Sequence, residues 1–322
     1  METTNTLINK VHESLKSNLA KVIIGKEKTL DLVICCLLSD GHLLIDDVPG
    51  VGKTTLAKGL AKSFAGSFNR LQFTPDMLPS DVTGVSIFNQ QTRDFEFRPG
   101  PVMAQVVLAD EINRATPKTQ SALLEAMEER QITVDGVTHK LPYPFIVIGT
   151  QNPIEYEGTF PLPEAQLDRF FMRSEIGYPG YMDEIRILDS QKLNHPINDL
   201  APVISAEQLH NAQNAVKEIF VSDAVKRYLV DIVRKTRDNE EIFLGSSPRG
   251  SLALLRAGQA MAAIRKRDYV IPDDIKYLAK YVLSHRIVLN PSGRIKNLTP
   301  DLIIEDIVAS VAIPDSTLLT KE

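Results

Sequence analysis

The residues with the most recognisable chemistry lie in residues 42–55, where an apolar run meets a proline and glycine turn and a series of helix formers follows. A strand, a tight loop and a helix start, in that order, are what a phosphate-binding loop requires. Gly50 and Gly52 let consecutive backbone N–H groups turn inward, and the helix start adds a partial positive charge. Lys53 can then reach the outer phosphates of a nucleotide, and Thr54 can offer its hydroxyl to Mg²⁺.

This loop departs from the strict pattern G-x-x-x-x-G-K-[ST] at its first glycine, where Asp47 stands. The departure leaves open a plain strand-to-helix turn that carries a surface lysine. The loop residues expected to contact a nucleotide are Asp47, Val48, Pro49, Gly50, Val51, Gly52, Lys53, Thr54 and Thr55.

Two later apolar runs also end in polar residues. Residues 106–109 lead into Asp110 and Glu111, and residues 145–148 lead to Asn152. Because ligands of open α/β sheets bind at the carboxyl ends of the strands, these side chains are expected near the loop. One carboxylate can hold Mg²⁺, the other can deprotonate an attacking water, and the amide can orient that water. Taken singly, an acidic pair can simply cap a helix, and Asn-Pro can simply make a turn.

Composition sets the broad class. The chain has 322 residues, 43% of them hydrophobic and 24% charged, which is typical of a globular protein of about two domains. A net charge of −5 argues against a wide nucleic-acid footprint. The N-terminus shows no secretory signal and no window is apolar enough to span a membrane, so a cytoplasmic protein is expected. Adjacent Cys35 and Cys36 are expected to be buried thiols, and the six histidines lack metal-ligand spacing.

Hydrophobic periodicity predicts an α/β fold for residues 1–179. Strands with no polar face alternate with helices, which is typical of a parallel sheet covered on both sides. Residues 81–98 predict a projecting β-hairpin, and residues 131–143 predict a second one that turns at Asp135 and Gly136. Residues 180–322 show helical periodicity throughout, which predicts a second, all-helical domain.

Four motifs together resemble the MoxR family of AAA+ ATPases over nearly the whole chain. They are Gly50-Val-Gly-Lys-Thr54, Leu108-Ala-Asp-Glu-Ile-Asn-Arg-Ala115, Gly149-Thr-Gln-Asn-Pro153 and Glu164-Ala-Gln-Leu-Asp-Arg-Phe170. The resemblance implies an ATP-hydrolysing homo-hexameric ring, a core sheet in AAA+ strand order and a helical lid. By position it places Lys53 on the phosphates, Thr54 and Asp110 on Mg²⁺, Glu111 as the base and Asn152 as sensor 1.

The resemblance also assigns roles to two arginines and to an N-terminal segment. Arg169 matches the arginine finger that reaches the next subunit's site, and Arg249 matches sensor 2 on the lid. A finger supplied in trans stabilises the charge that develops on the transferred phosphoryl group, although a surface salt bridge would also account for Arg169. Arg249 follows Pro248 in the first turn of a predicted helix. A cation at that position is unfavourable with the helix dipole, and a nearby anion such as a nucleotide phosphate would offset this. The adenine pocket is matched by Val22, Ile23 and Gly25, which would also serve as ordinary core.

These features together predict a Mg²⁺-dependent ATPase that remodels or matures a partner protein. The resemblance suggests partners with von Willebrand factor A-type domains, and the hairpin of residues 81–98 matches a helix-2 insert that could contact substrate. Three alternatives remain open: a motor on nucleic acid, which the acidic charge disfavours, a magnesium-chelatase-like subunit, and a nucleotide switch with little turnover.

Overall fold

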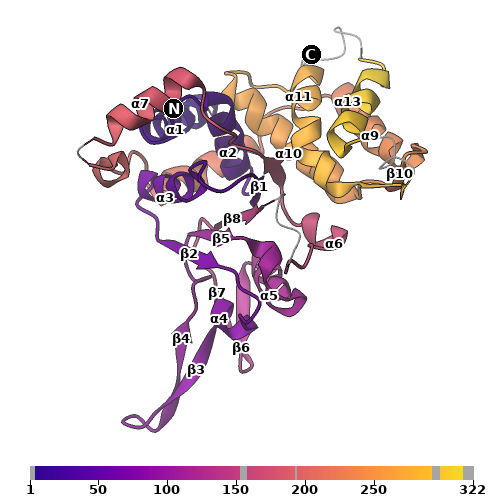
Figure 1. Ribbon diagram of the computed structural model, residues 1–322. Helices are drawn as coiled ribbons and strands as arrows, with labels where there is room; N and C mark the ends of the chain where they lie inside the picture. The colour runs from indigo at the N-terminus through magenta and orange to yellow at the C-terminus, as the bar shows by residue number, and fades with distance from the viewer. Residues whose placement is uncertain (1–3, 153–157, 193, 292–297, 315–322) are drawn as a thin grey trace.

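The computed structural model describes residues 4–152, 158–192, 194–291 and 298–314. Its central sheet consists of β1 (Leu43–Asp46), β2 (Phe68–Gln72), β5 (Val106–Asp110), β8 (Ile146–Gln151) and β9 (Met172–Ser174). These strands are parallel and follow the order β2-β5-β8-β1-β9 (Figure 1). The predicted parallel α/β sheet is therefore confirmed.

Helices cover both faces of this sheet. They are α1 (Thr4–Leu19), α2 (Glu27–Leu38), α3 (Lys53–Ser63) and α5 (Pro117–Glu129). Successive strand residues point to opposite faces, so Leu43 and Ile45 pack in the cluster that contains α1, α2 and α3, whereas Leu44 packs with α5. Burial on both faces explains why the central strands are apolar up to their carboxyl ends, where polar residues stand.

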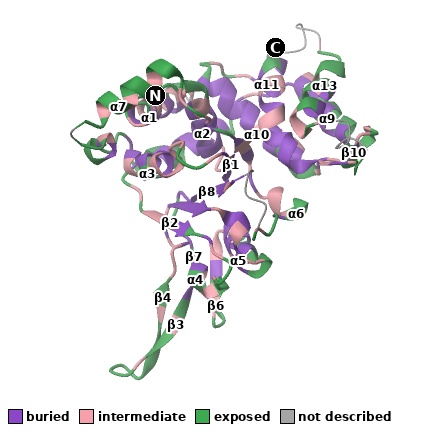
Figure 2. Ribbon diagram, in the orientation of Figure 1, coloured by how far each residue is buried: buried purple, intermediate pink, exposed green. Residues whose placement is uncertain are grey.

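The projecting hairpin begins later than the sequence pattern predicts. Residues 79–83 form a short helix, α4 (Pro79–Thr83), in which the Asp81 carboxylate accepts a hydrogen bond of 2.8 Å from the N–H of Leu78. The hairpin itself consists of β3 (Gly84–Asn89) and β4 (Asp94–Pro99). A proline at the first helical position and an acidic residue in the first turn favour the helix over the strand expected there. The hairpin extends from the body and is largely exposed (Figure 2).

The second hairpin lies where it was predicted. It pairs β6 (Gln131–Val134) with β7 (Val137–Lys140), and Asp135 and Gly136 turn with φ values of +50° and +78°. Positive φ at both central residues is the geometry of a two-residue hairpin turn.

The remainder of the chain is mainly helical. Its long helices are α7 (Tyr181–Ser190), α8 (Ala206–Val216), α9 (Asp223–Asp238), α10 (Pro248–Ile264), α11 (Pro272–Leu283) and α13 (Pro300–Ser310). Besides α4, the described residues form the short helices α6 (Glu164–Leu167), η1 (Ile112–Arg114), η2 (Pro196–Asp199) and η3 (Ser284–Arg286). The expectation of an all-helical part is wrong in one detail, because β10 (Ile242–Leu244) pairs antiparallel with β11 (Val288–Leu289). Strands this short leave no readable periodicity.

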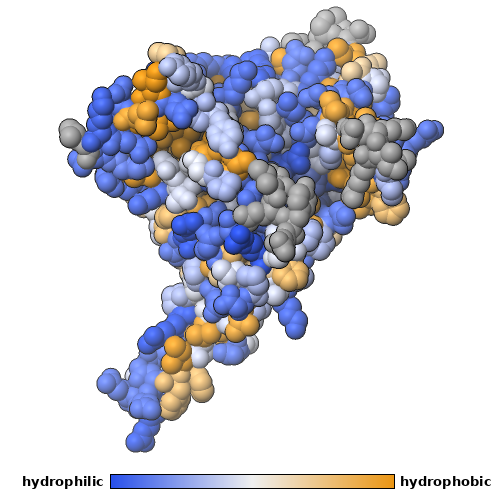
Figure 3. Space-filling view, viewed as in Figure 1, coloured by the Kyte–Doolittle hydropathy of each residue, from blue (hydrophilic) through white to orange (hydrophobic). Residues whose placement is uncertain are grey.

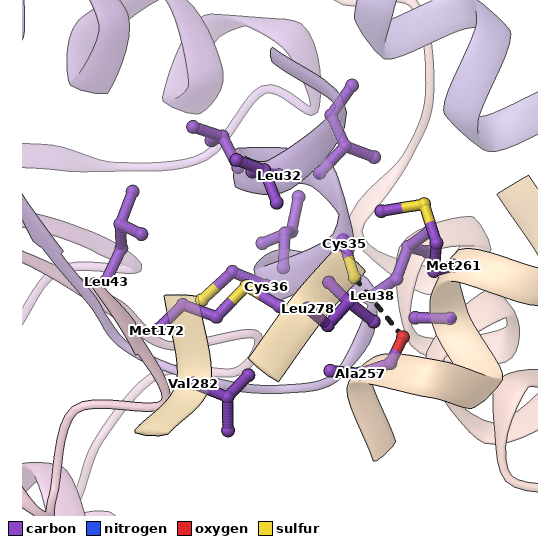
Figure 4. Close-up of a cluster of buried hydrophobic side chains, with 14 of the residues drawn as sticks. Leu32, Cys35, Cys36, Leu38, Leu43, Met172, Ala257, Met261, Leu278 and Val282 are labelled. Carbon is purple, nitrogen blue, oxygen red and sulfur yellow. Dashed lines mark hydrogen bonds between the residues drawn. The ribbon is translucent and has the colours of Figure 1, made fainter. Parts of the chain in front are cut away.

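A single hydrophobic cluster joins the sheet to the helical part. Helix α2 lies between the sheet and α10, and the thiol of Cys35 is 3.5 Å from the carbonyl oxygen of Ala257 in α10 (Figure 4). Both cysteines are fully buried, as expected, and burial raises the pKa of the Cys36 thiol well above its usual value. A domain division at residues 179 and 180 remains a prediction. Among the described residues, no helix is both long and apolar enough to cross a membrane.

Candidate active site

The loop between β1 and α3 has the backbone shape of a phosphate cradle. Gly50 and Gly52 have φ values of +86° and +97°, which L-residues with side chains rarely adopt. Gly52 is the N-cap of α3 and has no side chain to cap the helix, so the first N–H groups of α3 are suited to an anion. Thr54 and Thr55 lie in the first turn of the same helix.

Asp47 fixes the position of this loop. Its carboxylate accepts hydrogen bonds from the N–H groups of Val48 at 2.8 Å, Ile176 at 2.7 Å and Gly177 at 2.6 Å. Its carbonyl oxygen accepts a hydrogen bond of 2.7 Å from the Nζ of Lys53. Asp47 therefore replaces the first glycine of the usual pattern with a tether to the segment after β9, and it shapes the loop through that tether.

The N-terminal segment expected at the adenine lies against this loop. Ile23 is buried and its side chain approaches Gly52, where an added Cβ would lie 3.6 Å from the Cδ1 of Ile23. Val22 packs on Gly59 of α3, and Gly25 has a φ of +74° with the Asp183 carboxylate directly above it. Core packing and contact with a base are thus compatible for Val22 and Ile23.

The acidic pair follows β5 with each carboxylate held differently. Asp110 is buried, and its two oxygens accept hydrogen bonds from the Thr150 hydroxyl at 2.6 Å and from Arg70 at 2.7 Å. Glu111 has a φ of +55°, an uncommon conformation for a residue with a side chain. Its carboxylate accepts a hydrogen bond of 2.7 Å from Gln72, and its N–H donates to the Thr150 hydroxyl at 2.9 Å. The turn at Glu111 sends the two carboxylates to different partners.

The sheet brings the predicted polar residues to one edge. Gln72 stands opposite Asp110 in the β2–β5 pairing, and Asp46 stands opposite Gln151 in the β1–β8 pairing. Asn152 follows Gln151 directly and is buried. The loop, the acidic pair and Asn152 therefore follow neighbouring strands at the carboxyl edge of the sheet, as the sequence predicts.

These groups have the donor chemistry that a magnesium nucleotide requires. Thr54 offers a hydroxyl oxygen and Asp110 a carboxylate oxygen, and both are hard ligands of the type that Mg²⁺ prefers. The described part of the chain has no cluster of three or more metal-binding side chains. A magnesium ion here would therefore complete its shell with phosphate oxygens and water.

Comparison with known proteins identifies the chain. Residues 42–172 match the family model described as "ATPase family associated with various cellular activities (AAA)", and residues 234–307 match the AAA lid domain. "Chaperone MoxR1" of Mycobacterium tuberculosis is 39% identical over 94% of this chain and 82% of its own length. The chain belongs to the MoxR family of AAA+ ATPases. It is thus a nucleotide-binding ATPase, and AAA+ proteins are typically oligomeric.

Other relatives extend over nearly the same length. "Uncharacterized protein YeaC" of Bacillus subtilis is 53% identical and covers 91% of this chain and 92% of its own. A crystal structure of a Cytophaga hutchinsonii protein is 36% identical, with a TM-score of 0.88 and 97% of each chain covered. The predicted family, fold class and ATPase activity are confirmed.

The two arginines assigned by the family lie together, away from the loop of this ATPase. Glu128 of α5 forms an ion pair with Arg169 at 3.0 Å and another with Arg249. All three line a cavity of about 370 Å³ that also includes Gly41 and His42, the residues just before β1. The phosphate loop follows the other end of β1, and five residues of extended chain span roughly 16 Å. Neither arginine is placed to act on a nucleotide held by its own loop.

Several residues of the site were not expected from the sequence. Thr150 bridges both members of the acidic pair, Arg70 and Gln72 reach that pair from β2, and Glu128 joins the two arginines. The signal for Thr150 was present, because it lies inside the Gly149–Pro153 motif that contains Asn152. Nothing in the local sequence marks Glu128, since only the tertiary fold brings it to residues 169 and 249.

Proposed function

We propose that this MoxR-family protein hydrolyses ATP with Mg²⁺ in a ring of identical subunits, and that the cycle remodels or matures a partner protein. The observation that carries the proposal is the division of the site between the two edges of the sheet. The loop, the lysine and the acidic pair occupy the carboxyl edge, and the two arginines occupy the amino edge.

Each residue at the carboxyl edge has a task in this reaction. The N–H groups of residues 50–53 and the ammonium of Lys53 bind the phosphates. Thr54 and Asp110 would hold Mg²⁺, which would neutralise charge on the phosphate oxygens. Glu111 accepts the proton of the attacking water, and Asn152 orients that water. Gln72 and Thr150 hold Glu111 in place through hydrogen bonds to its carboxylate and to its backbone N–H.

The arginines supply the positive charge at the transferred phosphoryl group that a single subunit does not bring to its own loop. In a closed ring each subunit meets its neighbour through two different faces, so the amino edge of one sheet can face the loop of the next. Arg169, and Arg249 beside it, would then stabilise charge on the phosphoryl group held by the neighbouring subunit. A hexamer is the ring size that the family resemblance implies.

The β3–β4 hairpin is the surface that we assign to the partner. Phe88 and Phe95 are 50% and 68% exposed and contact each other with ring centroids 5.4 Å apart, on an arm that projects from the body (Figure 3). Exposed apolar side chains on a projecting element are typical of a contact with another protein. The chaperone name of the Mycobacterium tuberculosis relative supports a folding client, and a protein with a von Willebrand factor A-type domain is the kind we favour.

The experiment that tests this proposal is the substitution Glu111→Gln. Because a general base contributes about 10²–10⁴ in rate, we expect turnover to fall by about that factor while ATP remains bound. The matched control is Glu125→Gln, which removes an exposed carboxylate of α5 and should leave the rate unchanged. The ATP-bound Glu111→Gln protein should also retain its client, and the same variant without residues 88–95 should not.

The alternatives give different results. A nucleotide switch would bind ATP and behave the same with either residue at position 111. A nucleic-acid motor would be stimulated by DNA or RNA in a salt-dependent manner. A magnesium-chelatase-like subunit would need a tetrapyrrole-binding companion for its activity. Failure of the purified protein to hydrolyse ATP with Mg²⁺ would contradict the proposal itself.

A further inference from the structure

We propose that Asp168 and Arg286 form a buried clamp that positions Arg169 and Arg249 as one unit, so that both arginines reach the neighbouring subunit's nucleotide together. This inference rests on the proposed function above. It assigns positioning roles to two residues that touch no nucleotide.

Arg286 holds the arginine-finger segment from the helical part of the chain. Its guanidinium lies at the end of η3 with a side chain only 3% exposed. It donates hydrogen bonds to the carboxylate of Asp168 at 2.8 Å and to the carbonyl oxygens of Phe170 at 2.7 Å and Phe171 at 3.1 Å. The planar guanidinium has five donors in a fixed arrangement, so these contacts define both the position and the direction of the segment.

Asp168 connects this segment to the helix that carries Arg249. Its second carboxylate oxygen accepts a hydrogen bond of 3.0 Å from the Ser247 hydroxyl. Ser247 is the N-cap of α10, and its hydroxyl accepts from the N–H of Arg249 at 3.2 Å. An unbroken series of contacts therefore runs from Arg286 through Asp168 and Ser247 to the backbone of Arg249.

Glu128 joins the same two arginines at their charged ends. One carboxylate oxygen pairs with Arg169 and the other with Arg249, so the negative charge between them offsets their mutual repulsion. The arginines are thus linked near their backbones by Asp168 and Ser247 and at their guanidinium groups by Glu128.

Burial makes this arrangement depend on the charge of Asp168. Removal from water lowers the pKa of Arg286 to about 10, and the nearby Asp168 carboxylate opposes that effect, so the guanidinium is charged at neutral pH. A buried cation needs a paired anion, and neutralising the anion disturbs the group that it held. Asp168 is the acidic residue that pairs with Arg286, and the carbonyl groups around Arg286 carry only partial charge.

The test is Asp168→Asn in the full-length chain. A misplacement of about 1 Å in a catalytic group can cost roughly 10²-fold in rate, so we expect kcat to fall by that order with nucleotide affinity unchanged. The matched control is Asp274→Asn. It removes a fully buried carboxylate of α11 that pairs with Arg265 and Arg267, lowering the unfolding temperature but leaving kcat near that of the parent.

A mixing experiment separates positioning from a purely structural role. A Glu111→Gln subunit keeps its own arginines, and an Asp168→Asn subunit keeps its own loop and base. In a random one-to-one mixture about a quarter of the interfaces would combine the two intact halves, so the mixture should hydrolyse ATP faster than either variant alone. A mixture no faster than its components would overturn the clamp, as would a full rate for Asp168→Asn.

A milder pair of variants covers the case in which Asp168→Asn does not fold. Ser247→Ala removes the link between Asp168 and Arg249 together with one helix cap, and Ser222→Ala removes the corresponding cap of α9 alone. We expect similar losses of stability but a several-fold lower kcat for Ser247→Ala only, and equal rates would overturn the clamp. If the unaltered protein lacks ATPase activity or Glu111→Gln leaves its rate unchanged, the proposed function fails instead.

Discussion

The two edges of the sheet differ in how the chain assembles them. At the carboxyl edge, the groups suited to a nucleotide come from short segments that directly follow neighbouring strands, including Lys53, Asp110 and Asn152. At the amino edge, Glu128, Arg169, Arg249 and Arg286 come from four distant parts of the sequence, and they meet only in the folded chain.

The geometry of the two edges is set by different parts of the fold. The carboxyl edge follows from the strand order, because parallel strands end at the same side of a sheet. The amino edge depends on how the helical part packs on the sheet, so its geometry changes when that packing changes. In the function proposed above, the edge assigned to the nucleotide is therefore set by the sheet itself, and the edge assigned to a neighbour's site is set by the packing of the helical part.

The largest effect is expected for Arg169→Ala. A finger supplied by a neighbour is worth about 10³–10⁵ in rate, so we expect kcat to fall by at least 10³. Nucleotide affinity of dilute, unassembled subunits should not change, because Arg169 lies at the other end of β1 from its own loop. Arg227→Ala, which removes an exposed cation of α9, is the control. Weaker nucleotide binding by dilute Arg169→Ala subunits would mean that the arginine acts within its own subunit.

The same contrast explains what could be predicted from the sequence. The parallel sheet, the loop and the acidic pair follow from hydrophobic runs and the polar residues at their ends, and these signals are local. The helix at residues 79–83 was missed because alternation suggested a strand, although Pro79 and Asp81 mark a helix start. Glu128 and Arg286 could not have been singled out, since ion pairs across 41 and 118 residues are set by tertiary packing.

A smaller effect distinguishes the two ends of β1 itself. Asp47→Asn removes the charge that tethers the phosphate loop to Ile176 and Gly177. Hydrogen bonds to charged groups contribute about 1.5–3 kcal/mol, so we expect the nucleotide Kd to rise about tenfold or more. Asp40→Asn is the matched control, because Asp40 precedes β1 and pairs with Arg130 at the amino edge. Equal nucleotide Kd values for the two variants would contradict a tether specific to the loop.

The smallest predicted effect is the acid sensitivity of the amino edge, where two buried histidines lie. The ring of His42 accepts a hydrogen bond from the N–H of Val147 and donates one to the carbonyl of Met127, and His285 donates to Phe170. Burial lowers the pKa of both histidines well below its usual value, and the nearby positive charges of Arg130 and Arg286 add to this.

Since unfolded histidine has a pKa of about 6.5, the unfolded chain binds more protons than the folded one below that pH, and stability falls as the pH falls. Each histidine that stays neutral in the folded state contributes about 1.4 kcal/mol of lost stability per pH unit in that window. Urea unfolding between pH 7.5 and 5.5 measures this slope. His42→Gln should reduce the slope, while exposed His195→Gln should leave it unchanged. If His42→Gln and His285→Gln together keep the full slope, the acid sensitivity arises elsewhere in the chain, and the amino edge is no more sensitive to protonation than the nucleotide edge.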